Sequence, residues 1–309
     1  MKIYSAGDRN AKKLPWDPAH VQAAVKIPGM EFRVSGASRR VEIAHLVIAG
    51  WTGRDTASVE KHIAELEAIG VKRPRAVPVF YRVAASLLTS AREVEVVGEH
   101  SSGEAEFVLV GAPEALYVGV GSDHTDRKVE TYGVTVSKQM CPKPLAPELW
   151  PFAELESHWD RLVLRSHVTR GGKRTLYQEG EVTQMLAPRD LLARLSGSGK
   201  LAPGTAMFCG TLPVRGEIGG GERFEIELLD PVKGRSLRHE YAVRGDVPGL
   251  DAAPAGSWSR NQRQTNPRSR GEKHWQPRAG SSIRISGRAR CSWSGRRASR
   301  SRRWPGHWG

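Results

Sequence analysis

The chain has 309 residues, enough for one large domain or two smaller ones, each with a core of its own. Its formal net charge of +14 is unevenly distributed: residues 252–309 hold 14 Lys and Arg residues against one acid, Glu272. They carry +13, which leaves +1 for the preceding 251 residues. A body this close to neutral argues against a nucleic-acid-binding surface on the main part of the protein.

Composition also indicates in which cellular compartment the protein is found. No stretch approaches about 18 consecutive apolar residues, and the N-terminal MKIYSAGDRN lacks the apolar segment of a signal peptide. The three cysteines, Cys141, Cys209 and Cys291, follow no metal-ligand spacing, and so sparse and odd a number is typical of a reduced compartment. We therefore expect a cytoplasmic protein that does not enter the membrane.

In chain order, residues 1–29 show no sustained hydrophobic period, so we interpret them as an N-terminal extension, with Met30 as a second candidate for the natural start. Residues 30–34 and 40–51 are rich in apolar and β-branched side chains and predict two strands. A helix is predicted next, capped by Asp55 or Thr56 and ended by Gly70. Its apolar side chains recur at helical spacing: Val59, Ile63, Leu66 and Ile69.

The following segments read mainly as strands. Residues 78–88 predict a strand that leads into a loop or short helix, and residues 154–168 mix strand and helix signals. A short helix is predicted at 188–196, before a flexible GSGKLAPG segment. Apolar alternation predicts further strands at 92–98, 104–111, 115–121, 129–137 and 205–212, and a hairpin over 222–243 that turns at Asp230–Gly234.

Strands outnumber helices and do not alternate with them, which favours a β-rich α+β fold over repeated βαβ units. We expect residues 30–250 to form a single domain. Residues 251–309 have a different composition: from residue 252 on there is no Leu, Val, Phe or Tyr, while five of the nine tryptophans lie there. A segment of Arg, Ser, Gly and Trp cannot bury enough apolar surface to fold, so we expect a disordered tail.

Two interpretations of the tail remain open. It resembles an arm that binds RNA or another anionic surface through its arginines. The abrupt change to Arg, Ser, Gly and Trp is also what out-of-frame translation of a GC-rich gene produces, and we favour this second interpretation.

Acidic side chains gather at the ends of two neighbouring predicted strands. Glu104 and Glu106 are two residues apart in an extended segment, so both side chains point to one face. Asp123 follows the next strand, with Asp126 as a competing candidate three residues later. Together these carboxylates could hold one hard cation such as Mg²⁺, although surface acids without a ligand show the same spacing.

Four motifs in this order resemble the fumarylacetoacetate hydrolase superfamily, in an uncharacterised bacterial branch, from about Val41 to Val243. They are HIAEL, GEAEFVLVG, SDHTDR and VSKQMCP. The resemblance implies a mixed β-sheet roll with a few flanking helices. It also implies His62 and Glu65 as a water-activating pair, Lys138 near the substrate, and Glu104, Glu106 and Asp123, rather than Asp126, as ligands of Mg²⁺ or Mn²⁺.

Two further segments, YQEGEVTQM and LAPGTAMFCGTLP, resemble the superfamily's Gln-x-Gly and Thr-Gly-Thr-Pro segments and imply Gln178 and Thr211 at the substrate. Arg82 stands where the superfamily commonly has a Lys-Pro pair, which implies Arg82 as a substrate-binding residue and a substrate anchor that differs from the usual one. Only 16 residues separate Glu106 from Asp123, fewer than is usual. Thr205 replaces the usual acid of the Pro-Gly-Asp turn.

The resemblance therefore implies a metal-dependent hydrolase or lyase that acts on a small 2-oxo or 1,3-dioxo acid, as a homodimer. Two other functions stay open: a nucleic-acid-binding protein that uses its basic tail, and a catalytically silent relative that binds a metabolite. We expect His124 to be structural rather than a ligand. Without a metal, repulsion among the three carboxylates should raise the pKa of at least one of them.

Overall fold

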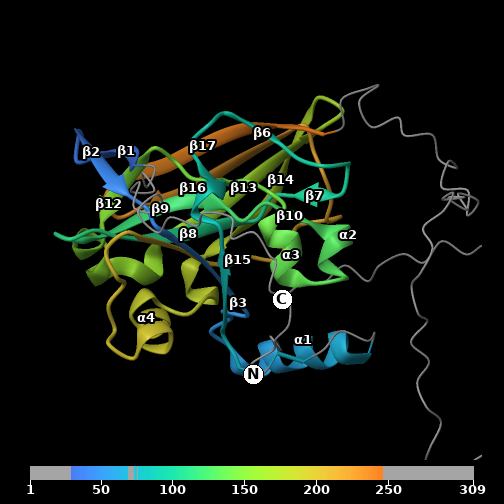
Figure 1. The fold of residues 1–309 in the computed structure, drawn as a ribbon, viewed down its shortest axis with the longest axis horizontal. Coiled ribbons are helices and arrows are strands. Elements are labelled where there is room, and N and C mark those ends of the chain that lie inside the picture. The colour runs from blue at the N-terminus through green and yellow to red at the C-terminus, as the bar shows by residue number, and fades with distance from the viewer. Residues whose placement is uncertain (1–28, 69–72, 75, 246–309) are drawn as a thin grey trace, which may run out of the picture. The chain divides into compact units, whose positions relative to one another are not determined.

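The computed structural model describes residues 29–68, 73–74 and 76–245 (Figure 1). All of them belong to one compact unit of the chain. The two termini, including the tail from residue 251, lie outside the described residues. Two β-sheets contain most of the strand residues of the described chain, and its helices are few and short. The predicted β-rich α+β roll is confirmed.

The larger sheet has eight strands and mixed polarity. Two of its neighbouring pairs are parallel, β1 with β12 and β15 with β3, and the other pairs are antiparallel. Every residue of β8 is buried, as expected of a central strand. In sheet order the strands are β2 (Ala37–Glu42), β1 (Gly29–Val34), β12 (Glu148–Pro151), β9 (Leu116–Ser122), β8 (Ala105–Gly111), β15 (Thr205–Thr211), β3 (His45–Gly50) and β4 (Val79–Val83).

The second sheet has five strands, and its strand β6 pairs in parallel with β17. Buried and half-buried residues alternate along β13, so one face of this sheet is turned inward. In order the strands are β14 (Lys173–Glu181), β13 (Val163–Arg170), β16 (Arg223–Asp230), β17 (Arg235–Arg244) and β6 (Glu93–Glu95).

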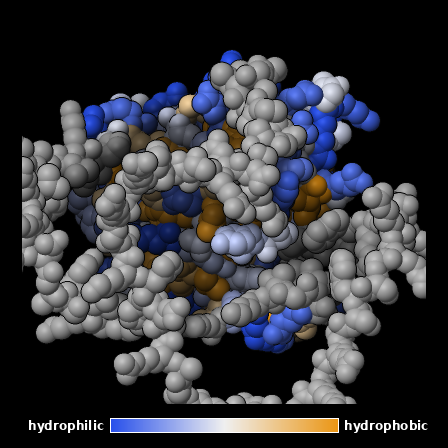
Figure 2. Space-filling model, turned by 45° about the vertical axis from the view of Figure 1, so that its right-hand side comes forward, coloured by the Kyte–Doolittle hydropathy of each residue, from blue (hydrophilic) through white to orange (hydrophobic). Residues whose placement is uncertain are grey.

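The core between the two sheets is apolar. Phe107 and Leu109 of β8 belong to the same buried cluster as Leu164 of β13 and Ile226 of β16. The opposite face of the larger sheet carries a second cluster, which includes Val108 of β8. Successive side chains of β8 therefore enter two different cores. On the face drawn in Figure 2, hydrophilic side chains lie along the upper edge of the described chain, and hydrophobic ones show mainly below them.

Short elements connect the sheets. The α-helices are α1 (Thr56–Ala68), α2 (Arg127–Glu130), α3 (Val134–Gln139) and α4 (Pro188–Ser196). The 3₁₀ helices are η2 (Ala85–Leu87), η3 (Phe152–Glu154), η4 (Glu156–Arg161) and η5 (Val182–Gln184). Two small sheets pair β7 (Ser101–Ser102) with β10 (Thr125–Asp126), and β5 (Leu88–Thr89) with β11 (Lys143–Pro144). None of the helices in the described part of the chain is long and apolar enough to cross a membrane.

Most predicted elements are confirmed, and their local causes are visible. Helix α4 has Pro188 in its first turn and ends at Gly197, whose left-handed φ of 66° suits glycine. The predicted hairpin is β16 and β17, and Asp230 accepts backbone hydrogen bonds from Val232 and Lys233 in its turn. Of the apolar side chains predicted to share one face of α1, Val59 is half-buried and Ile63 is buried. The side chain of Leu66 and residue Ile69 lie outside the part of the chain that the structure describes.

Two predicted strands are wrong. Residues 40–51 form parts of two strands, β2 and β3, rather than one. Residues 129–130 belong to helix α2 and residues 134–137 to helix α3, with a turn between them. Their valines favour a strand, but Asp126 caps α2 by accepting a hydrogen bond from Val129 N at 2.8 Å. Strands β12 and β14 had not been predicted.

Candidate metal centre

Strands β8 and β9 bring the three predicted carboxylates together. Their antiparallel register pairs Ala105 with Ser122, so Glu104 lies opposite Asp123. The backbone confirms this placement, because Asp123 N donates to Glu104 O at 2.9 Å. Glu106 shares its face of β8 with Val108 because strand side chains alternate. The ligand atoms of Glu104, Glu106 and Asp123, here named the carboxylate cluster, lie within 4.8 Å of one another.

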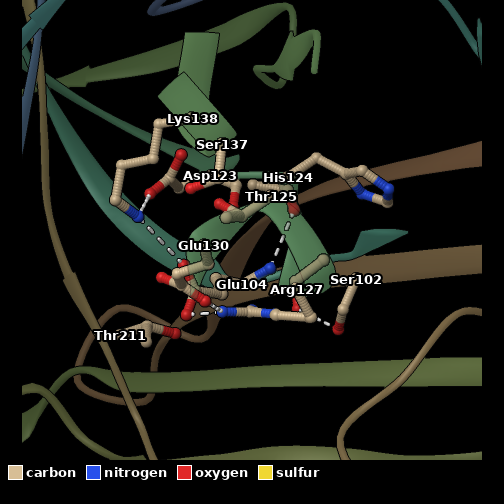
Figure 3. Close-up of polar contacts among 12 residues, drawn as sticks. Ser102, Glu104, Asp123, His124, Thr125, Arg127, Glu130, Ser137, Lys138 and Thr211 are labelled. Carbon is tan, nitrogen blue, oxygen red and sulfur yellow. Dashed lines mark hydrogen bonds and ion pairs between the residues drawn. The ribbon is translucent and has the colours of Figure 1, made fainter. Parts of the chain in front are cut away.

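Three cations surround the carboxylate cluster, and Figure 3 labels two of them, Lys138 and Arg127. Lys138 of α3 donates to Asp123 Oδ2 and lies 3.5 Å from Glu104 Oε2. Lys143 of β11 places Nζ 3.0 Å from Asp123 Oδ1, and both of these side chains are fully buried. Arg127 of α2 lies 3.0 Å from Glu104 Oε1 and also pairs with Glu130. Positive charge from two helices and a small strand therefore compensates the clustered acids.

This environment shifts the pKa values of Asp123 and Glu106 in opposite directions. Burial would raise the pKa of Asp123, but the charges of Lys138 and Lys143 outweigh it and lower that pKa to about 2. Burial, followed by the charges of Asp123 and Glu104, raises the pKa of Glu106 well above its usual value. The expected rise for at least one carboxylate is confirmed, although burial is a larger cause than repulsion.

The donor set fits a hard divalent cation. Three carboxylates supply the oxygen ligands that Mg²⁺ and Mn²⁺ prefer. Asp123 Oδ1 is buried without a hydrogen bond among the described residues, even though Lys143 is close enough for an ion pair. The two observations are compatible, because the ammonium meets the distance for an ion pair without the angles of a hydrogen bond. This oxygen therefore keeps a lone pair for a ligand.

Two neighbours of Asp123 have structural roles. Asp126, the competing candidate, caps helix α2 and does not join the carboxylate cluster. His124 is buried between Tyr241 OH, 3.0 Å from its Nδ1, and Ser101 Oγ, 2.9 Å from its Nε2. Burial, followed by the charge of Lys143, lowers the pKa of His124 to about 3, so this imidazole is neutral. The expectation that His124 is structural is confirmed.

The structure brings Gln178 and Thr211 close to the carboxylate cluster. Thr211 Oγ1 donates to Ala105 O at 2.7 Å, between Glu104 and Glu106. Gln178 accepts from Ala105 N at 3.0 Å and donates to Thr211 Oγ1 at 2.7 Å. Both residues contact the strand that carries the two glutamates.

Arg82 is not brought to the carboxylate cluster. In β4 it pairs with Val47, whereas Tyr81 pairs with Ile48, which belongs to the apolar cluster of Val108. Arg82 therefore lies on the opposite face of the sheet, where it lines a cavity of about 820 Å³. Tyr81 lies on the carboxylate side: burial raises its pKa, and the charges of Lys138 and Asp123 also act on it.

The predicted water-activating pair lies in helix α1. His62 and Glu65 are three residues apart within Thr56–Ala68, which places them on one side of the helix backbone. Their side chains lie outside the described residues, so the pair stays a prediction.

Sequence reasoning missed three residues of this centre. Arg127 is the last residue of the SDHTDR motif, and this position is the signal that could have identified it. Lys143 had a signal of its own, as a lone lysine between Pro142 and Pro144 in an otherwise apolar segment. Gly210 donates its N–H to Glu106 Oε2 at 2.7 Å, with a φ of 100° that favours glycine. A Cβ there would also lie 1.7 Å from Thr52 Oγ1.

Comparisons with known proteins agree with this fold. A family model described as "Protein of unknown function (DUF2848)" matches residues 49–241. A putative fumarylpyruvate hydrolase from Burkholderia cenocepacia is similar in structure, with a TM-score of 0.50 and 18% identity over 80% of this chain and 100% of that chain. A putative fumarylacetoacetate isomerase/hydrolase from Oleispira antarctica has a TM-score of 0.50 and 17% identity, over 69% and 99%. No curated protein matches the sequence.

Proposed function

This chain belongs to the DUF2848 family of proteins of unknown function, and we propose that it is a Mg²⁺- or Mn²⁺-dependent hydrolase or lyase that acts on a small 2-oxo or 1,3-dioxo acid. The observation that carries the proposal is the buried carboxylate cluster with Lys138 beside it. The structurally similar proteins described as fumarylpyruvate hydrolase and fumarylacetoacetate isomerase/hydrolase support this class of substrate.

Glu104, Glu106 and Asp123 would hold the ion. When bound, a divalent ion would supply positive charge for two neighbouring oxygen atoms of the oxo acid. The sheet register fixes two of these carboxylates opposite each other, so little rearrangement is needed to present their oxygens. Arg127 holds Glu104 from the outside, and Lys143 holds Asp123.

Lys138 is suited to the acidic end of the substrate. Burial alone would lower the pKa of this lysine, but the charges of Asp123 and Glu104 outweigh it and raise that pKa. Lys138 therefore carries a proton throughout the physiological range and supplies a fixed positive charge beside the carboxylate cluster. A carboxylate or a developing oxyanion of the substrate is the natural partner for such a charge.

Water activation is assigned to His62 and Glu65. Glu65 would orient and polarise the imidazole, and the imidazole would then take a proton from water. Thr211, whose hydroxyl contacts the ligand strand, is the proposed substrate contact on β15. Arg82 is not assigned to the same substrate site, because it lies on the other face of the sheet.

The proposal includes four properties of the whole chain: its domain, its location, its oligomeric state and the origin of its tail. Residues 30–250 form the catalytic domain, the protein acts in the cytoplasm as a homodimer, and residues 251–309 come from a frameshift and carry no function. Sedimentation that finds only monomers would contradict the dimer. Reading the gene in the adjacent frame after residue 250 would test the origin of the tail.

The decisive experiment combines metal titration with a substrate screen. Oxaloacetate-like, acylpyruvate and 2-hydroxydienoate compounds are incubated with the protein and Mg²⁺. We expect turnover of at least one class, loss of it with a chelator, and recovery with Mg²⁺ or Mn²⁺. Calorimetry should show metal binding that is lost in Glu106→Gln and kept in Glu95→Gln, an exposed acid of β6. Absence of metal binding by the native protein would refute the proposal.

A further inference from the structure

Two irregular strand pairings meet beside the carboxylate cluster. In the second sheet, the register of β13 and β14 shifts after the Ser166–Gln178 pair, which leaves Tyr177 as an extra residue of β14. In the larger sheet, β15 pairs regularly with β8 up to Phe208 and resumes at Thr211, which lies opposite Glu106. Such bulges redirect side chains and release backbone groups from their usual partners.

The bulge of β14 directs Gln178 inward, where every donor and acceptor of its side-chain amide has a hydrogen-bond partner. The side chain is fully buried. Its Oε1 accepts from Ala105 N at 3.0 Å and from Ser166 Oγ at 2.9 Å. Its Nε2 donates to Thr211 Oγ1 at 2.7 Å and to Leu212 O at 2.6 Å. An amide has two N–H donors and two acceptor sites on its oxygen, so Gln178 has no group left for a substrate.

The bulge of β15 supplies the other contacts of the ligand strand. Because Gly210 is released from regular pairing, its N–H donates to Glu106 Oε2 at 2.7 Å. Thr211 Oγ1 donates to Ala105 O at 2.7 Å. Side chains therefore hold both the N–H and the carbonyl of Ala105, the one residue between Glu104 and Glu106. Any shift of this peptide would change the separation of the two carboxylates.

We propose that Gln178 is a positioning residue of the metal centre: it links the second sheet to the peptide between Glu104 and Glu106 and so sets the geometry of these two ligands. Thr211 is the second member of this link, because its hydroxyl connects the Gln178 amide to the Ala105 carbonyl. The inference rests on the proposed function in one respect only, since it requires that the carboxylate cluster binds a divalent ion.

The test measures Mn²⁺ affinity, with free Mn²⁺ followed by electron paramagnetic resonance. Residues that orient metal ligands typically contribute about 10- to 100-fold to affinity, so Gln178→Ala should weaken Mn²⁺ binding by about that factor. Gln184→Ala is the matched control: it removes an exposed amide from the same segment and should bind Mn²⁺ as the native protein does.

Thr211 gives a second test if Gln178→Ala does not fold. Thr211→Val keeps the side-chain shape but removes the hydroxyl, which leaves the Ala105 carbonyl and one Gln178 N–H without their partners. It should weaken Mn²⁺ binding, while Thr211→Ser, which retains the hydroxyl, should restore it. A purely apolar packing role for Thr211 would give the opposite order, because Val preserves the volume and Ser does not.

The outcomes separate this inference from the proposed function. If the native protein does not bind Mn²⁺, the proposed function fails and the inference fails with it. If the native protein binds Mn²⁺ and both Gln178→Ala and Thr211→Val bind it equally well, only the inference is overturned. Weakened binding in these variants, with Gln184→Ala and Thr211→Ser unchanged, would establish the positioning role.

Discussion

At the scale of single residues, two buried acids of the carboxylate cluster have pKa values shifted in opposite directions. Asp123 is buried but ionised, because Lys138 and Lys143 pair with it. Glu106 is also buried, and burial, followed by the charges of Asp123 and Glu104, raises its pKa, although the N–H of Gly210 donates to this carboxylate. A carboxylate held in this way costs stability in its ionised form, which a bound cation would offset.

Glu106→Gln should therefore stabilise the metal-free protein while removing metal binding. The pKa of Glu106 is higher in the folded than in the unfolded protein, so its destabilising effect is absent well below pH 4.5 and grows as the pH rises. We expect a higher free energy of unfolding for the variant than for the native protein at pH 7.5, and a smaller difference between the two at pH 5. Urea unfolding with a chelator present measures this. A variant less stable than the native protein at pH 7.5 would contradict it.

Lys143→Met should have the reverse effect on stability. The lysine is fully buried against a fully buried Asp123, and its removal leaves that carboxylate with one cation fewer. Breaking a buried ion pair from one side typically costs about 3–5 kcal/mol. Chemical denaturation should show a loss of this size, whereas Lys128→Met, at an exposed position of α2, should change stability little. A small loss in Lys143→Met would mean that Lys138 alone compensates Asp123.

At the scale of elements, the proposed metal ligands and the proposed base lie on different parts of the chain. The carboxylate cluster depends on the register of β8 and β9, while His62 and Glu65 belong to helix α1. A change in the helix should therefore leave the ligand register intact, so metal binding and proton transfer can be separated by mutation.

His62→Ala and Glu65→Gln should each lower the turnover number while leaving Mg²⁺ affinity nearly unchanged. Loss of a general base typically costs roughly 10²–10⁴-fold in rate. The measurement uses the best substrate from the screen, with calorimetry for the metal. Lys61→Ala, at an exposed position of the same helix, is the control and should retain activity. Native rates in His62→Ala would show that the helix pair takes no part in the reaction.

At the scale of the whole molecule, the charge and the core belong to different regions. Residues 252–309 carry +13 of the formal net charge of +14, and the buried clusters of the described chain draw on residues 32–241. We therefore assign stability and chemistry to the chain before residue 251.

Deletion of residues 251–309 should accordingly leave folding, metal affinity and any activity unchanged. The reason is compositional, since this segment lacks the apolar side chains that a core requires. Thermal unfolding and Mn²⁺ titration of the chain that ends at Leu250 would check this. A truncated protein that is insoluble, when the complete chain is soluble, would show that the tail contributes to the fold.

The sequence by itself determined the strand-rich fold and the carboxylates, because both depend on local order. A two-residue period places Glu104 and Glu106 on one face of any strand. Helix α4 and the hairpin of β16 and β17 carry their own turn and cap residues. The strand predicted over residues 129–137 is wrong because valines at alternate positions favour a strand, whereas Asp126, outside that segment, caps helix α2, and α3 follows after a turn.

Only the tertiary structure decided which other residues meet the carboxylate cluster. Lys143 and Arg127 reach it from elements whose approach no local pattern encodes. Arg82 and Tyr81 are adjacent in sequence, and the pairing of β4 with β3 alone determines that Tyr81 faces the carboxylates and Arg82 does not. The bulges at Tyr177 and Gly210 arise from pairing between distant strands, so the role of Gln178 becomes visible only when both sheets are in place.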